Sequence, residues 1–237
     1  MIHEIKERIF AEYPYKTELH AHTLPISPCS EFSPEELIEL YRKTGVHAIA
    51  LTNHFTPSHL SKQSPEAFAR DYVLAYRRFK ACAEAAGITP LFGIELRFAE
   101  NSNDYLLFGV DEQDVLDVTK YVPLGLERFV GEYKRETMLL IQAHPKRNGM
   151  TDVELSYLDG IESFNMHPGH NSRPAIAARM ANEANLIATG GTDFHHPGHE
   201  ACCLLRSRTL PTDAHTLVEL LRGRDYVLDI SGSLILP

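Results

Sequence analysis

The pattern of hydrophobic and polar positions alternates along the chain between short apolar runs and segments with a helical period, which predicts short strands separated by helices. Short runs rich in β-branched and other apolar side chains, such as HAIALT and MLLIQA, are typical of buried strands. The runs that fit this description are 16–20, 47–52, 88–96, 105–110, 138–143, 160–165, 186–190 and, with a weaker pattern, 226–230. The chain therefore consists of a series of strand and helix units, without an internal repeat or a linker.

Three of the intervening segments carry the end signals of helices. The segment 33–45 begins with Ser33 and Glu36 at capping-box spacing, with a proline between them, and it ends at a glycine. Segments 64–87 and 212–223 begin with a serine or a threonine and also end at a glycine. Alternation of strands and helices over this length predicts a parallel α/β architecture, either an open sheet or a closed barrel.

Length and composition indicate one large domain. The 237 residues, 1–237, are enough for one barrel-sized core, and the 43% hydrophobic and 23% charged residues form an ordinary globular composition. No apolar run approaches the roughly 18 residues of a membrane span, and Glu4 and Glu7 interrupt the N-terminus where a signal peptide would be apolar. We therefore expect a cytoplasmic protein that contacts no membrane. The net charge of −9 argues against a general nucleic-acid binder.

The 13 histidines are the unusual feature of the composition, and many of them follow predicted strands. His20 and His22 end the first run, and Asp193 and His195 follow the run 186–190. Because residues two apart on an extended chain point to the same side, each of these pairs can bind one cation. The other candidate ligands at strand ends are His54, Glu95, His144, His167 and His170.

These strand ends together predict a metal centre. In a β/α barrel the C-terminal ends of the strands converge on one mouth, and imidazoles with carboxylates are the ligand set that suits zinc, iron or manganese. A single histidine pair would be weak evidence, but five strand ends that carry His, Glu or Asp are difficult to explain otherwise. The remaining alternative is an eroded site that no longer binds metal.

The motifs ELHAHT, ALTNH, FGIEL, QAHP, IESFN…H and GTDFH stand in this order between residues 17 and 196. With them the chain resembles the PHP family, the polymerase and histidinol phosphatase superfamily of metal-dependent phosphoesterases. The resemblance implies a distorted TIM-like barrel of seven β/α units, with up to three divalent ions at the C-terminal ends of its strands.

The resemblance also implies which side chains bind each ion. The first ion would be held by four ligands, His20, His22, Glu95 and Asp193. The second would share Glu95 and add His144 and a histidine after the sixth strand, for which the family spacing favours His170 over His167. The third ion would be bound by His54 and His195.

Two departures from the family pattern concern the third ion. Asn53 stands in TNH where the family has an aspartate, and the His or Asp that normally follows the first histidine pair is missing from LPISPCS. Cys29 in that segment offers a thiolate, although a small buried apolar residue is the expected role of such a cysteine. We expect two tightly held ions of zinc, manganese or iron, and a third that is held weakly or not at all.

The resemblance implies hydrolysis of a phosphate ester by a hydroxide held between two metals. Three arginines close to the ligands, Arg97, Arg147 and Arg173, are the candidate phosphate-binding residues, because guanidinium groups make bidentate contacts with phosphate oxygens. Asp193 and His195 are the candidate catalytic residues, with His195 or a metal-bound water as the general acid. We expect a phosphomonoesterase that acts on a small soluble molecule.

Three other functions stay open at this point. An amidohydrolase-like metal hydrolase would usually add a bridging lysine, whereas this chain has Glu95 after its third strand. A nuclease-type phosphodiesterase fits poorly with the net charge of −9. A non-catalytic metal-binding regulatory module is favoured by Asn53 and the missing ligand. The sequence contains no signal for the oligomeric state.

Overall fold

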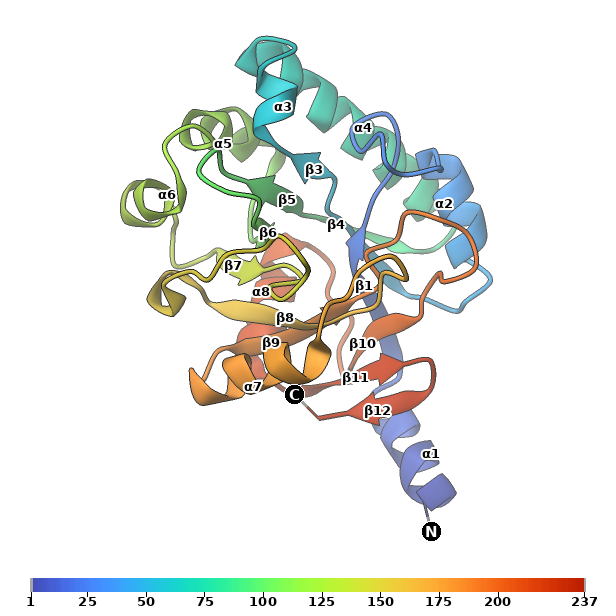
Figure 1. Cartoon of the computed structure of the whole chain (residues 1–237). Coiled ribbons are helices and arrows are strands. Elements are labelled where there is room, and N and C mark those ends of the chain that lie inside the picture. Colours follow the sequence, from blue (N-terminus) through green and yellow to red (C-terminus); the bar gives the residue numbers. More distant parts are fainter. Residues whose placement is uncertain (1, 237) are drawn as a thin grey trace.

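The computed structural model describes residues 2–236, in which two six-stranded sheets form the centre and the helices lie around them (Figure 1). The first sheet has the order β12-β11-β10-β1-β2-β4 and the second the order β3-β5-β6-β7-β8-β9. The strands are β1 (Tyr15–Ala21), β2 (Ala48–Leu51), β3 (His54–Phe55), β4 (Thr89–Phe92), β5 (Ile94–Arg97), β6 (Asp104–Phe108), β7 (Leu139–Gln142), β8 (Gly160–Asn165), β9 (Ile187–Gly191), β10 (Cys203–Ser207), β11 (Tyr226–Ile230) and β12 (Ser233–Ile235).

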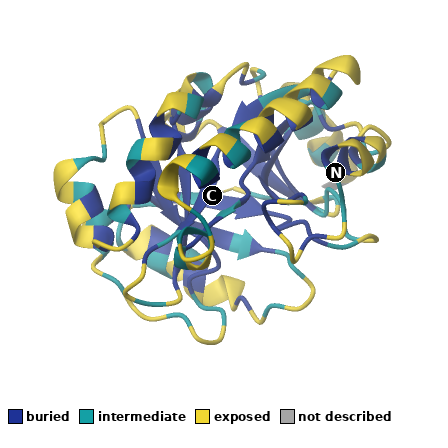
Figure 2. Ribbon diagram, turned by 90° about the horizontal axis from the view of Figure 1, so that it is seen from above, coloured by how far each residue is buried: buried dark blue, intermediate teal, exposed yellow. Residues whose placement is uncertain are grey.

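The helices are α1 (Ile2–Glu12), α2 (Pro34–Tyr41), α3 (Pro57–Leu60), α4 (Pro65–Ala85), α5 (Val115–Tyr121), α6 (Leu126–Glu132), α7 (Pro174–Glu183) and α8 (Ala214–Gly223), with two 3₁₀ turns at Glu112–Asp114 and Leu155–Tyr157. Most of the helices lie around the outside of the two sheets, whereas α8 packs against the inner cluster between the sheets and α1 projects from the start of β1. Viewed from above, the strands are buried at the centre and the helices expose their outer sides (Figure 2). None of the helices described is long and apolar enough to cross a membrane.

The predicted elements are largely confirmed. Every predicted run contains a strand, but the run 88–96 is divided at Gly93 into β4 of the first sheet and β5 of the second. The capping box at the start of α2 is present, with the amide of Ser33 donating to Glu36 Oε2 at 2.8 Å. Strands β3, β10 and β12 were not predicted, and the N-cap of α8 is Asp213 rather than the threonine before it.

The prediction of a parallel architecture is confirmed only in part, because half of the strand pairings are antiparallel. Strands β1, β2 and β4 pair in parallel, as do β7, β8 and β9, whereas β6 runs antiparallel to both β5 and β7. The connection 98–103 between β5 and β6 is too short for the crossover that a parallel pair needs. The reversal places Asp104, the first residue of β6, directly opposite Arg97 at the end of β5.

The two sheets meet where β1 and β9 end. Ala21 and Phe194 form a parallel bridge, and the amide of His22 donates to the Phe194 carbonyl at 3.2 Å. The α/β class is therefore confirmed, while closure of the sheets into the seven-stranded TIM-like barrel stays a prediction. The single domain 1–237 also stays a prediction, and its first and last residues lie outside the described ones.

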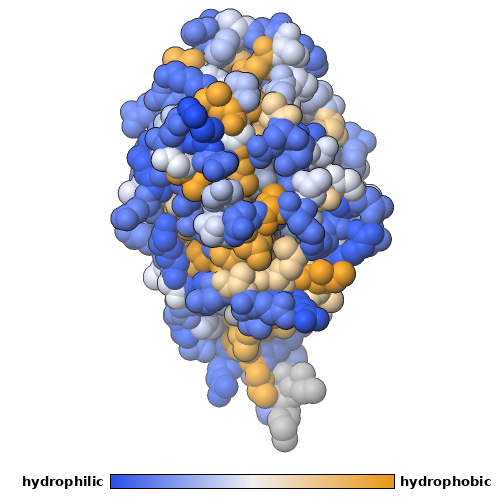
Figure 3. All heavy atoms as spheres, turned by 60° about the vertical axis from the view of Figure 1, so that its left-hand side comes forward, coloured by the Kyte–Doolittle hydropathy of each residue, from blue (hydrophilic) through white to orange (hydrophobic). Residues whose placement is uncertain are grey.

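Two apolar clusters form the core, one outside the sheets and one between them. The outer cluster joins α2 and α4 to the strands, and the inner one combines Leu91, Leu106 and Leu217 from β4, β6 and α8. Because side chains alternate along a strand, Ile94 and Leu96 of β5 pack in the outer cluster and the residues between and after them face inward. The surface over α5 and α6 is mostly hydrophilic, with small apolar patches (Figure 3).

Candidate metal centre

The four side chains predicted for the first ion converge at one end of the strands. His20 lies in β1 and His22 directly follows it, while Glu95 comes from β5 and Asp193 from the segment after β9. The His20 Nε2 atom lies 3.3 Å from Glu95 Oε1 and 3.4 Å from Asp193 Oδ1. The His22 Nε2 atom lies 3.5 Å from Glu95 Oε2 and 3.3 Å from Asp193 Oδ1. All four residues are buried, so two carboxylates and two imidazoles surround one small space.

The hydrogen bonds of this cluster leave the metal-facing atoms free. Buried polar atoms are normally paired, yet among the residues described His20 Nε2, His22 Nε2 and Glu95 Oε2 make no hydrogen bond. The Nδ1 atom of His20 lies 2.8 Å from Glu162 Oε1, which fixes the ring and leaves the Nε2 lone pair for a cation. These unpaired nitrogen and oxygen atoms are suitable ligands for a divalent ion, so the residues present fit a metal site.

A second group of possible ligands adjoins the first through Glu95. Its Oε1 atom lies 3.0 Å from His144 Nε2, and Asp104 Oδ2 lies 3.8 Å from the same nitrogen. Glu95, Asp104 and His144 are close enough to hold one ion. His144 has a φ of 30°, a conformation that costs a non-glycine residue about 1–3 kcal/mol and is common at functional sites. Its amide donates to Glu162 Oε2 at 2.9 Å, which holds the histidine in place.

Asp104 is the acidic residue that the sequence analysis missed. It is fully buried, and it reaches the centre only because β6 runs antiparallel to β5. In a parallel strand the first residue would lie at the opposite end of the sheet. The polar sequence NSND at 101–104, between two apolar runs, is the signal that would have indicated a tight reversal.

His170 and His167 lie in different positions at the mouth. The His170 Nδ1 atom is 3.2 Å from Asp193 Oδ2, and its Nε2 is 3.3 Å from a guanidinium nitrogen of Arg147. The His167 ring stacks on that of His170, with 4.0 Å between centroids, and its Nδ1 accepts the amide proton of Gly169. The structure thus places His170 against a predicted ligand, while its role in binding the second ion stays a prediction.

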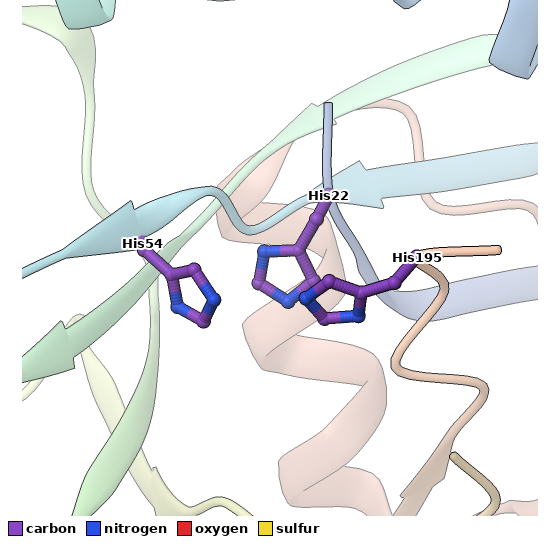
Figure 4. A group of neighbouring side chains, drawn as sticks. All are labelled: His22, His54 and His195. Carbon is purple, nitrogen blue, oxygen red and sulfur yellow. The ribbon is translucent and has the colours of Figure 1, made fainter. Parts of the chain in front are cut away.

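A third group consists of His22, His54 and His195, whose rings gather at the mouth from β1, β3 and the segment after β9 (Figure 4). The ring centroids are 4.4 Å apart for His22 and His54 and 4.3 Å apart for His22 and His195. Cys29 is exposed rather than buried, so the expectation of a buried apolar role is wrong, and its thiol contacts both His54 and His195. Burial disfavours the thiolate, but the hydrogen bonds from His195 and His54 outweigh it and lower the pKa of Cys29 to about 6.

Asn53, the other departure from the family pattern, has a structural role. Its Oδ1 atom accepts hydrogen bonds from the amide of Thr23 at 2.7 Å and the hydroxyl of Ser27 at 2.9 Å. Its Nδ2 group donates to the Thr23 hydroxyl at 3.2 Å. An aspartate could not donate this last bond. Asn53 therefore fixes the loop after β1 to the end of β2 instead of reaching toward the metal centre.

The charges within the centre are strongly coupled. Burial opposes ionisation of Glu95, but His54 and His20 outweigh it and hold the pKa of Glu95 well below its ordinary value. Burial also opposes the charge on His54, yet Glu95 outweighs it and raises the pKa of His54 to about 10. The pKa of His22 lies well below its ordinary value, because burial and the neighbouring His195 and His54 all disfavour a proton there. The carboxylates are thus anionic and His54 holds a proton that a metal ion would displace.

Two of the three predicted arginines lie beside the centre. Arg97 makes a bidentate ion pair with Asp104 at 2.7 and 2.6 Å, and Arg147 contacts the same carboxylate at 3.1 Å. Arg173 donates instead to the Lys146 carbonyl and to the side chain of Asn148, so it braces the loop that carries Arg147.

A cavity of about 170 Å³ lies beside His54 and Arg97. Cys29, His54 and Arg97 line it on the side of the histidine clusters, and Lys62 lies on its wall. One histidine of the third group, His54, therefore shares this cavity with two cationic side chains, Arg97 and Lys62.

Comparison with solved structures shows the same fold in three bacterial proteins. A two-domain protein of Bacteroides vulgatus that contains a predicted PHP-like metal-dependent phosphoesterase is 17% identical, with a TM-score of 0.61, over 90% of this chain and 64% of that one. PsfC of Pseudomonas syringae is 16% identical with a TM-score of 0.63, over 87% of each chain. An amidohydrolase of Chromobacterium violaceum with bound sulfate is 17% identical with a TM-score of 0.51, over 77% of this chain and 88% of that one.

The chain spans less than two thirds of the Bacteroides protein, and none of the curated proteins compared matches it. A family profile described as the PHP domain matches residues 18–231, which include every candidate ligand described above. The chain therefore belongs to the PHP domain family.

Proposed function

We propose that the protein is a metal-dependent phosphomonoesterase that hydrolyses a small phosphate ester. The observation that carries the proposal is the pair of guanidinium groups beside the carboxylate-bridged histidine cluster. Arg97 and Arg147 share the single carboxylate of Asp104, so one positive charge remains uncompensated next to Glu95 and His144. A terminal phosphate carries the opposite charge and offers the oxygens that guanidinium groups bind best.

Each ligand has a role in this proposal. His20, His22, Glu95 and Asp193 would hold the first ion, and Glu95, His144 and His170 the second, with zinc, manganese or iron as the candidates. Such ions polarise the phosphoryl oxygens and lower the pKa of a bound water. Glu162 orients two of the ligands at once, because it bonds His20 Nδ1 and the His144 amide.

The arginines and His195 act on the substrate. Arg97 and Arg147 bind the phosphate, and Asp104 fixes the direction of both side chains. His195 donates its Nδ1 proton to the Asp193 carbonyl at 2.9 Å, so Nε2 is the atom that remains for a ligand or for proton transfer to the leaving group.

The size of the cavity and the charge of the protein favour a small monoester. A volume of about 170 Å³ accommodates a phosphate with a short leaving group. The net charge of −9 opposes binding of a polyanion such as a nucleic acid. Because one structural neighbour is described as an amidohydrolase, amide hydrolysis is the alternative reaction, and the assay below includes amide substrates.

The test is a substrate panel with protein that has been stripped by a chelator and reloaded with zinc, manganese or iron(II). We expect hydrolysis of p-nitrophenyl phosphate, loss of this activity on stripping, and little activity with bis(p-nitrophenyl) phosphate or with amides. Arg97→Ala should lower turnover of the monoester, while Arg128→Ala, which removes an exposed arginine on α6, should not. Preference for the diester or an amide would refute the proposal, and metal binding without any hydrolysis would favour a regulatory module.

A further inference from the structure

Glu18 is a carboxylate in the middle of β1 that the proposed chemistry does not use. Its side chain is fully buried, and its two oxygens accept three hydrogen bonds. The Oε1 atom accepts from the amide of His20 at 3.1 Å and from the amide of Thr192 at 3.0 Å, and Oε2 accepts from the Tyr41 hydroxyl at 2.9 Å. Because burial of an ionisable group is costly unless hydrogen bonds compensate it, these three donors explain how Glu18 is accommodated.

The first of the two amides lies at an irregularity of β1. The strand slips by one residue against β2 between Glu18 and Ala21, and His20 lies inside this bulge. A bulge interrupts the ladder of backbone hydrogen bonds and changes the direction of a side chain. Because Glu18 accepts the amide proton of His20 at this interruption, it stabilises the bulge that directs the imidazole into the centre.

The second amide precedes a strained ligand. Asp193 has a φ of 54°, in the left-handed region that disfavours residues other than glycine, and such a conformation persists only where the surrounding structure enforces it. The amide before it, that of Thr192, donates to Glu18, and the amide after it, that of Phe194, donates to the His20 carbonyl at 3.1 Å. Two hydrogen bonds to β1 therefore hold the backbone on both sides of Asp193.

We propose that Glu18 is a positioning residue for the first metal ion. His20 lies in the first sheet and Asp193 follows a strand of the second, with His20 Nε2 3.4 Å from Asp193 Oδ1. The Oε1 atom of Glu18 joins these two segments and so sets the separation between the two ligands. Glu18 acts through backbone amides and is not itself a ligand. The inference deepens the proposed function, and it rests on the assignment of the first ion made there.

The role requires a hydrogen-bond acceptor at this position rather than a negative charge, and two variants of similar size separate these properties. Glu18→Gln keeps Oε1 as the acceptor of both amides, and its side-chain amide can donate to the oxygen of Tyr41. Glu18→Met has a similar length but offers no comparable acceptor, so it leaves the amides of His20 and Thr192 unpaired in the interior.

Asp114→Leu is the matched control. Asp114 is also buried, and it also accepts from a backbone amide, that of Asp111, and from a tyrosine hydroxyl, that of Tyr133, both at 2.9 Å. It lies directly before α5 rather than at the metal centre. Its replacement should lower the melting temperature without changing metal affinity, so it identifies effects that come from stability alone.

The test is a titration of cobalt(II) into stripped protein that carries His144→Ala, in which the first ion is the one expected to remain. Adding Glu18→Met should lower the cobalt affinity about 10–100-fold, as loss of a group that orients a ligand does, and should change the visible spectrum of the bound cobalt. Adding Glu18→Gln or Asp114→Leu should leave affinity and spectrum close to those of the background. Unchanged cobalt binding in Glu18→Met would overturn the inference. Equal losses in Glu18→Met and Glu18→Gln would also overturn it, because the charge would then be responsible.

Amide hydrogen exchange of the unaltered protein is a second measurement, and it decides the question if Glu18→Met fails to fold. The amides of His20 and Thr192 should exchange slowly in stripped protein, because Glu18 pairs them before an ion is bound. Fast exchange that slows only when metal is added would show that the ion sets the separation, and would overturn the inference. Phosphatase activity is tested separately: metal-loaded protein without it would refute the proposed function and leave the role of Glu18 standing.

Discussion

Replacing Glu95 by glutamine should weaken two metal ions together. The carboxylate is fully buried, and four imidazoles surround it. Its Oε1 atom lies 3.0 Å from His144 Nε2 and 3.3 Å from His20 Nε2, and its Oε2 atom lies 2.5 Å from His54 Nδ1 and 3.5 Å from His22 Nε2. Glutamine keeps the volume of the side chain, but it removes the charge and replaces one oxygen by an amide nitrogen that cannot bind a cation.

The expected size of the effect follows from this burial. Removing one partner from a buried charge pair costs about 3–5 kcal/mol, which corresponds to roughly two to four powers of ten in metal affinity. Glu162→Gln is the matched control, because Glu162 is also buried but bonds the ligands rather than the ion. Loss of such an orienting group costs about 10–100-fold. We therefore predict a ranking: Glu95→Gln should bind both metal ions with lower affinity than Glu162→Gln does.

The assay is metal content after dialysis against a chelator series, with the melting temperature measured for each sample. Glu95→Gln should lose two ions at similar chelator strength, whereas His144→Ala should lose mainly one. A second readout needs no metal: without the carboxylate, the pKa of His54 in the stripped protein should fall from about 10, because burial then dominates. If Glu95→Gln kept both ions and full activity, the assignment of Glu95 as a ligand shared by two ions would be wrong.

Three further changes test other parts of the centre. Arg147→Ala should lower kcat/KM for a phosphate monoester roughly ten- to hundredfold at constant metal content; an unchanged value would exclude a phosphate contact. Stripped protein should lose stability as the pH rises from 6.5 to about 10, because the raised pKa of His54 stabilises the fold only while its proton is bound. The measurement is the melting temperature as a function of pH, with and without chelator. The dependence on pH should disappear when metal replaces that proton. Gly191→Ala would bring a methyl group to 2.5 Å from His20 Cβ, so it should cost about 1–3 kcal/mol and reduce metal content, whereas Gly131→Ala in α6, where nothing lies within 4 Å, should not.

The part of the centre that depends on local patterns was predictable from the sequence. His20 and His22 are two apart on one strand, and the structure brings both to the same two carboxylates. Glu95 lies between two apolar residues of β5, and alternation along the strand turns it to the inner side. These positions follow from the two-residue period of a strand, which a sequence displays directly.

The parts that depend on strand direction and on distant contacts were not predictable in this way. Asp104 reaches the centre because β6 reverses, and strand direction is set by the length of a connection rather than by the pattern within the strand. Strand β10 (Cys203–Ser207) pairs antiparallel with β1, nearly two hundred residues earlier in the chain, so no local signal announces the pairing. Cys29 is fixed by hydrogen bonds of its neighbours to three other segments, which the sequence of its own loop does not reveal.

The local charge would allow an acidic protein to attract the anionic substrate that we propose. The two carboxylates that face the first ion, Glu95 and Asp193, carry two negative charges. Two divalent ions would bring four positive charges, which leaves a surplus of two. Asp104 is outweighed by Arg97 and Arg147, which adds one more positive charge at the same mouth. A phosphate monoester carries close to two negative charges at neutral pH. The mouth is thus cationic within a chain of net charge −9 only when metal is bound, so metal loading would control substrate binding as well as the chemical step.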